Sequence, residues 1–155
     1  MILLFSCHQT QNLKQEVVYK TDNGETWVRQ FFRNSNMIKS EGRYKDSSNI
    51  GIYRVYTING LINFEENYNF KGELNGIFRL YYDNYPNGNF IKQEGNYYNG
   101  KQIGNWKFYR PDGTIYLSLD LDSNQMVTYY SRFDLQGHFL KDSSGLFSCD
   151  TSELW

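Results

Sequence analysis

The side chains that could perform acid–base or nucleophilic chemistry are few and scattered in this sequence of 155 residues. The only two histidines are His8 and His138, and neither has a nearby Cys, Asp or Ser in an arrangement that recurs in hydrolases. Glu65 and Glu66 are adjacent, so on a strand they would point to opposite faces and could not act as a glycosidase pair. The glycines mark turns instead of a phosphate-binding loop, because no helix is expected after them. The sequence therefore predicts a protein that is not an enzyme and has no metal site or cofactor.

Cations and tyrosines recur two residues apart, and this pattern suits binding better than catalysis. The residues concerned are Arg54 and Tyr56, Arg79 and Tyr81, and Lys107 and Tyr109. Tyrosine presents rigid amphipathic area, and arginine beside tyrosine is common on recognition surfaces. The alternative is a solvated face of cross-strand pairs, each contributing about 0.2–1 kcal/mol. These six residues form the candidate binding face, for a protein or glycan partner.

Cys7 ends the apolar run of residues 1–6, and this arrangement resembles the end of a bacterial lipoprotein signal. The resemblance implies that Cys7 carries a lipid and that Cys149 is left as an unpaired thiol. A secretory signal also has a basic segment and an apolar segment of roughly 7–15 residues, so the full signal would begin upstream of Met1. The polar stretch 8–16 would then serve as a tether. The alternative is a cytoplasmic protein in which Cys7 is incidental.

Composition predicts an all-β protein with many tight turns. Aromatic residues make up 18% of the chain, alanine is absent, and asparagine and glycine are abundant. Aromatic side chains fit pleated surfaces, whereas Asn and Gly favour turns and disfavour helices. The net charge of -1 provides no field that would draw the chain onto nucleic acid. No apolar stretch reaches the roughly 20 residues that a membrane-spanning helix needs, so contact with a membrane is expected only through the lipid.

An internal repeat determines the expected fold. Residues 51–56, 76–81 and 104–109 align with one another at spacings of 25 and 28 residues. Each segment is followed by a turn signal, such as Asn59-Gly60 or Asp112-Gly113, and then by a second strand. Divergent units flank these three, at residues 17–29 and 127–140. We therefore expect antiparallel β-hairpins, roughly ten strands in all, that form a single meandering sheet.

Two-residue turns at Asn59-Gly60 and Asp112-Gly113 would fix which residues face each other. The expected pairs are Ile58 with Leu61, Val55 with Phe64, Arg54 with Glu65, Phe108 with Leu117, Lys107 with Ser118 and, across the longer middle loop, Arg79 with Glu94. Strand alternation then separates an aromatic side from the Arg/Tyr side. The aromatic side is expected to be buried and contains Tyr53, Val55, Phe78, Leu80, Trp106 and Phe108, with Ile62, Phe64, Ile91, Ile115, Leu117 and Leu119 from the second strands. Lys107, which has no carboxylate in its hairpin partner, is expected to be the freest cation.

Residues 97–113, with Tyr, Asn-Gly-Lys, Gly, an aromatic–basic–aromatic run and Asp-Gly in order, resemble the MORN-variant repeat of bacterial proteins. The resemblance covers about residues 26–125. Many such proteins carry an antitoxin-like, YwqK-type family label, and many are lipoproteins. Glu66 departs from the pattern, because it replaces the glycine found at Gly42 and Gly95.

These patterns together predict three segments and one principal function. The segments are a truncated lipoprotein signal and tether at 1–15, a repeat domain at 16–142 and a tail at 143–155. The expected function is that of a non-enzymatic scaffold in the bacterial cell envelope, anchored through Cys7, that binds protein or glycan and not nucleic acid. The alternative, suggested by the family label, is a cytoplasmic antitoxin-like module that binds a partner toxin.

Overall fold

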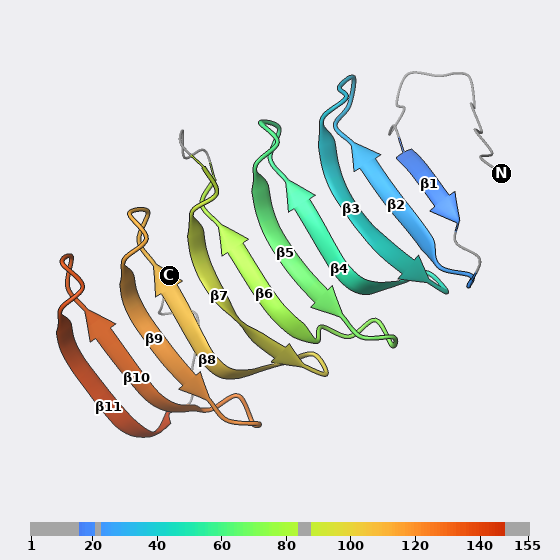
Figure 1. Ribbon diagram of the computed structural model, residues 1–155. Coiled ribbons are helices and arrows are strands. Elements are labelled where there is room, and N and C mark those ends of the chain that lie inside the picture. Colours follow the sequence, from blue (N-terminus) through green and yellow to red (C-terminus); the bar gives the residue numbers. More distant parts are fainter. Residues whose placement is uncertain (1–15, 21–22, 84–87, 148–155) are drawn as a thin grey trace.

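The protein forms one antiparallel sheet whose strands follow each other in chain order, as seen in the computed structural model (Figure 1). The structure describes residues 16–20, 23–83 and 88–147, and eleven strands lie in these ranges. They are β1 (Glu16–Lys20), β2 (Thr26–Phe31), β3 (Ile38–Lys45), β4 (Ser48–Tyr56), β5 (Ile62–Tyr68), β6 (Gly76–Tyr81), β7 (Ile91–Tyr98), β8 (Lys101–Tyr109), β9 (Ile115–Leu121), β10 (Val127–Phe133) and β11 (Phe139–Phe147). The prediction of an all-β fold made of hairpins in a single meandering sheet is confirmed.

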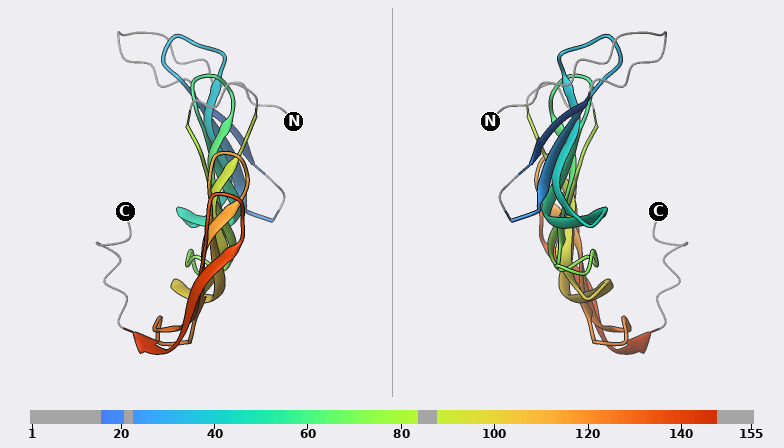
Figure 2. Two further views of the ribbon diagram at one scale, coloured as in Figure 1. Left: turned by 90° about the vertical axis from the view of Figure 1, so that its left-hand side faces the viewer. Right: turned by 90° about the vertical axis from the view of Figure 1, so that its right-hand side faces the viewer.

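The sheet is a single layer of strands. Seen on edge, the ribbons overlap in one narrow band, and the turns after β3, β5 and β7 curl out to the same side (Figure 2). Each strand pairs antiparallel with its chain neighbours, from β1 with β2 to β10 with β11. β11 continues beyond residue 142, where the sequence placed the end of the repeat domain.

The turn at Asn59-Gly60 differs from the one that the sequence predicts. The Thr57 amide donates to the Leu61 carbonyl (2.8 Å), and the Gly60 amide donates to the Thr57 carbonyl (2.9 Å). Only Gly60 of the two predicted turn residues has a positive φ, at 80°. The loop therefore has three residues, with the glycine in the left-handed conformation that this loop type requires. The prediction that Ile58 faces Leu61 is wrong.

A β-bulge restores the predicted register a few residues further along. The pairing shifts between Val55 and Tyr56, so that Val55 faces Phe64 and Arg54 faces Glu65 as expected. The hairpin β8–β9 repeats this arrangement, with a three-residue loop and a shift between Phe108 and Tyr109. The same bulge also sets the tyrosine at the end of β4, β6 and β8 opposite an isoleucine, as in the pair Tyr109 and Ile115.

Two-residue turns occur between the hairpins. Asp46 and Ser47 have φ values of 48° and 69°, and the flanking residues Lys45 and Ser48 pair directly. Asn99 and Gly100 form the same kind of turn, with φ values of 48° and 78°. These are the positions where both central residues have the positive φ of a type I′ turn.

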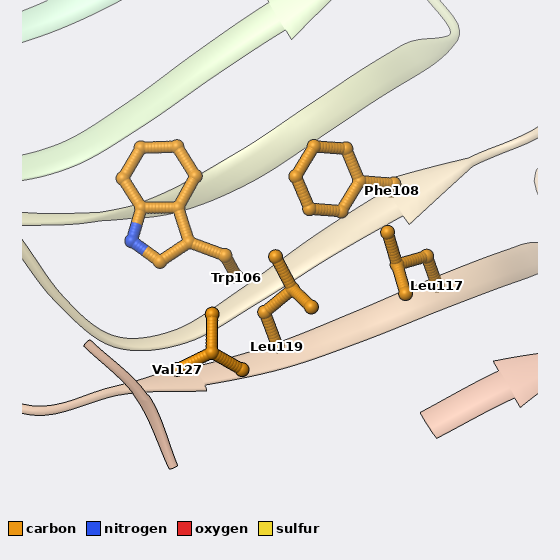
Figure 3. Packing of buried hydrophobic residues seen from close by; sticks show 5 residues of the cluster. All are labelled: Trp106, Phe108, Leu117, Leu119 and Val127. Atoms are coloured by element: carbon orange, nitrogen blue, oxygen red, sulfur yellow. The ribbon is translucent and has the colours of Figure 1, made fainter. Parts of the chain in front are cut away.

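The aromatic side of the sheet holds the best-buried cluster of the described residues, and this cluster lies toward the C-terminal strands. Trp106, Phe108, Leu117, Leu119 and Val127 project from β8, β9 and β10 and gather on the same side (Figure 3). Trp106 is only 1% exposed, and the ring of Tyr97 meets it edge-on with 5.3 Å between the ring centroids. Such aromatic pairs add about 0.5–1.5 kcal/mol beyond the area that they bury. The expected burial of Trp106, Phe108, Leu117 and Leu119 is confirmed, whereas the other eight residues expected on this side are only half-buried.

Gly95 explains why the repeat carries glycine in its second strand. A Cβ atom added at Gly95 would lie 2.2 Å from Cδ2 of Trp106, so the indole ring occupies the space above the glycine. Gly42 is covered in the same way by Tyr53, whose Cδ2 would lie 2.6 Å from an added Cβ. At the equivalent position of β5 the repeat has Glu66 in place of glycine, and its carboxylate accepts a hydrogen bond from Tyr68 (2.6 Å). The glycines are therefore needed where a large ring packs flat on the neighbouring strand.

Candidate functional site

The side of the sheet opposite the aromatic cluster carries a row of charged residues that occupy equivalent positions in successive strands. We call it the charge row, and it consists of Arg29, Glu41, Arg54, Glu65, Arg79, Glu94 and Lys107 on β2 to β8. Each member faces the next one directly across the ladder. Positive and negative charges thus alternate at the strand spacing of about 4.8 Å.

The centre of the charge row is held by ion pairs on both sides of Glu65. Arg54 Nε lies 2.6 Å from Glu65 Oε2, and Arg79 Nη1 lies 3.5 Å from Glu65 Oε1. Glu65 is 9% exposed, whereas the side chains of the two arginines are about a third exposed. Exposed ion pairs contribute about 0.2–1 kcal/mol each, so the main effect here is to fix the orientation of the guanidinium groups.

The predicted pairs of the charge row are confirmed, and the hairpin β2–β3 contains a further pair of the same kind. Arg79 Nε lies 3.4 Å from Glu94 Oε2, in the register that the sequence predicted. Arg29 Nη2 lies 2.8 Å from Glu41 Oε2, which is a pair that the sequence analysis missed. The signal was present, because Glu41 precedes Gly42 just as Glu94 precedes Gly95 in the aligned second strands.

Two of the three tyrosines donate hydrogen bonds to carboxylates of the charge row. Tyr56 Oη lies 2.6 Å from Glu41 Oε1, and Tyr109 Oη lies 2.5 Å from Glu94 Oε1. Burial and the hydrogen bond to Glu41 raise the pKa of Tyr56 to about 12, and burial with the bond to Glu94 also raises the pKa of Tyr109. Burial alone would raise the pKa of Glu41, but the bonds from Tyr56 and Arg29 outweigh it and the pKa is lowered. These hydroxyls therefore stay protonated near neutral pH and act as donors to the carboxylates of Glu41 and Glu94.

Tyr81 occupies the equivalent position on β6 but differs in its bonding. Within the described ranges, its hydroxyl makes no hydrogen bond. Burial, followed by the charge of Glu65, raises its pKa above the usual value. Tyr81 is thus the tyrosine of the candidate binding face whose hydroxyl is available to a partner.

Lys107 ends the charge row, and its surroundings differ from those of the arginines. It faces Ser118 on β9, as predicted, and Glu94 on β7, which the sequence analysis missed. Over the part of the chain that the structure describes, no carboxylate lies within 4.0 Å of its ammonium group. The Ser118 hydroxyl instead accepts a bond from the Asn105 amide (2.9 Å). The row therefore carries one more cation than carboxylate, and the surplus lies at Lys107.

A shallow open hollow of about 260 Å³ lies beside Lys107 on β6, β7 and β8. Its lining includes Ile77, Arg79, Glu94, Asn96, Asn105 and Lys107. Nothing in the sequence pattern signals it. It lies where the pairing of β7 with β8 shifts, between the pairs Glu94–Lys107 and Asn96–Ile103.

All six residues of the candidate binding face lie on or next to the charge row. Arg54, Arg79 and Lys107 are members of the row, and the tyrosines follow two residues later on the same strands. In residues 16–20, 23–83 and 88–147, no group of three or more His, Cys, Asp or Glu side chains could hold a metal ion. The predicted lipidation site Cys7 and the thiol of Cys149 lie outside the described residues.

None of the described segments forms a helix long and apolar enough to cross a membrane. Comparison of the chain with protein-family models and with curated proteins found no match.

Proposed function

We propose that the protein is a non-enzymatic binding scaffold of the bacterial cell envelope, which holds a protein or glycan partner on the face that carries the charge row. The observation behind the proposal is the row itself, in which alternating charges are flanked by tyrosines at the regular spacing of a sheet. Arginine and tyrosine dominate the energetics of many interfaces. The ion pairs keep Arg54 and Arg79 in fixed orientations, which lowers the entropy lost when a partner binds.

The first prediction concerns the centre of this face. The double variant Arg79→Ala, Tyr81→Ala should lose the partner retained by the wild-type protein, because it removes a cation and the tyrosine hydroxyl that has no bond within the sheet. Its free energy of unfolding should fall by only about 1–2 kcal/mol, since partly exposed ion pairs contribute little. Glu65 also keeps its pair with Arg54, and Glu94 keeps its bond from Tyr109. The measurement is retention of envelope proteins and of cell-wall glycan fragments on the immobilised protein, with urea unfolding in parallel.

A matched control replaces the same kinds of side chain away from the charge row. Tyr98 and Lys101 flank the β7–β8 turn, and both are exposed. The variant Tyr98→Ala, Lys101→Ala should retain the partner as the wild type does. Equal loss from both double variants would contradict a role for the charge row, and a large loss of stability in the first variant would mean that this face belongs to the core.

The second prediction concerns the anchor, which we propose to be a lipid on Cys7. Cells that express the natural gene and are fed a palmitate analogue should incorporate the label into the wild-type protein and not into Cys7→Ala. A Cys149→Ala variant is the control and should be labelled normally, because a lipoprotein signal modifies only the cysteine that follows it. Labelling that persists in Cys7→Ala would exclude Cys7 as the lipidated residue. A wild-type protein that takes up no label would favour the cytoplasmic antitoxin-like module.

A further inference from the structure

The hollow beside Lys107 is the one part of the charge row where cationic charge is in surplus. We propose that this hollow receives the carboxylate of an acidic side chain on a protein partner, with Lys107 as its counter-charge. The inference rests on the proposed function, because it assumes that the face with the charge row contacts a partner. It goes further in assigning one subsite and the chemistry of the group that enters it.

The charge balance of the hollow supports an anion. Three charged side chains line it, and these are Arg79, Glu94 and Lys107. Glu94 already accepts a hydrogen bond from Tyr109 (2.5 Å) and lies 3.4 Å from Arg79 Nε. Lys107 lies next in the row with no carboxylate within 4.0 Å in the described part of the chain. A lysine ammonium has three donors, so an incoming carboxylate gains charge-assisted hydrogen bonds without displacing the bonds of Glu94.

The remaining lining fits the rest of an acidic side chain. Asn96 is exposed on β7, and its amide can donate to a second carboxylate oxygen. Ile77 is 43% exposed and faces Asn96 across the β6–β7 ladder, where it offers an apolar wall to the methylene groups. Asn105 is held in place by bonds from its amide to Ser118 Oγ and Asp120 Oδ1, both at 2.9 Å. One wall is therefore apolar and another is rigid, and the donors of Asn96 and Lys107 line the same hollow.

The size of the hollow and the alternating charges of the charge row favour a single carboxylate group over a polymer that carries many carboxylates. Pockets for drug-sized ligands are roughly 300–1,000 Å³, and a hollow of about 260 Å³ is smaller than these. A polyanionic glycan laid along the row would meet Glu41, Glu65 and Glu94 on every second strand and be repelled there. A protein surface can place one acidic residue at Lys107 and basic residues elsewhere. The alternating row thus favours a protein partner.

The test is an NMR titration of the full chain with N-acetyl-glutamate N-methylamide, which carries one acidic side chain and no other charge. The expected result is saturable shifts, at millimolar ligand, of the backbone amides of Gly95, Asn96 and Lys107. The neutral glutamine analogue should give none of them. Lys107→Gln should weaken binding about tenfold or more, as expected for the loss of a charge-assisted bond. Lys101→Gln, on the same strand but at the turn, should bind as the wild type does.

The inference would be overturned if the wild type showed no saturable shift, or if Lys107→Gln bound the glutamate derivative as tightly as the wild type does. Tighter binding of glucuronate than of the glutamate derivative would also overturn it, because the hollow would then be assigned to an acidic glycan. Partner retention is also measured for Lys107→Gln and compared with that of the double variant Arg79→Ala, Tyr81→Ala. Loss of the partner from the double variant but not from Lys107→Gln would overturn the assignment of the hollow and leave the proposed function standing. Retention by both variants would contradict the proposed function itself.

Discussion

Replacing Trp106 by alanine is expected to lower the free energy of unfolding by about 3–5 kcal/mol, the range for deleting a large buried aromatic side chain. Trp106 is 1% exposed, and its ring contacts Phe78 and Tyr97 as well as covering Gly95. A single-layer sheet has no second layer that could collapse into the space left behind. Urea unfolding followed by circular dichroism measures the loss, with the midpoint falling while the m-value stays constant.

The control for this prediction is an exposed aromatic residue of the same region. Tyr98 is 59% exposed at the end of β7, and Tyr98→Ala should change stability by no more than about 0.5 kcal/mol. Equal losses from Trp106→Ala and Tyr98→Ala would mean that the aromatic side is not the core, and the assignment of the two faces would then have to be reversed.

The register of each hairpin could be predicted because two deviations from the expected geometry offset each other. Asn59-Gly60 suits either a two-residue turn or the end of a three-residue loop, since glycine at the last position tolerates positive φ in both. The structure has the longer loop, and the bulge between Val55 and Tyr56 absorbs the extra residue. Beyond the bulge, the side chains therefore alternate between the two faces of the sheet as predicted. The sequence pattern fixes which residues share a face, but not how the chain turns between strands.

Contacts between hairpins were harder to predict than contacts within them. The pair Glu65–Arg79 joins β5 to β6, and the pairing of Glu94 with Lys107 joins β7 to β8. Their register depends on irregular segments between hairpins, such as the shift between Glu94 and Asn96 opposite β8. The spacing of apolar residues along the sequence does not indicate such a shift in pairing. For this reason Lys107 was correctly placed opposite Ser118, whereas the neighbouring carboxylate and the hollow beside it were missed.

Adding one methyl group at Gly95 is expected to destabilise the protein by about 1–3 kcal/mol, the usual cost of overpacking a core. The new Cβ would lie 2.2 Å from Cδ2 and 2.3 Å from Cε2 of Trp106, and an indole ring cannot yield as the end of a flexible side chain can. Gly95 has no positive φ, so the expected cost arises from the ring and not from the backbone.

A double-mutant cycle isolates that contact, and the sign of the effect should reverse within it. In a Trp106→Ala background the ring is gone, and Gly95→Ala should be neutral or stabilising by about 0.5–1 kcal/mol, because alanine loses less backbone entropy in a strand than glycine does. Urea unfolding of the four proteins gives the coupling free energy directly. A cost of Gly95→Ala that is the same in both backgrounds would show that the glycine is required for another reason. A reversal would establish that glycine in the second strand of the repeat is there to admit the aromatic ring of the next hairpin.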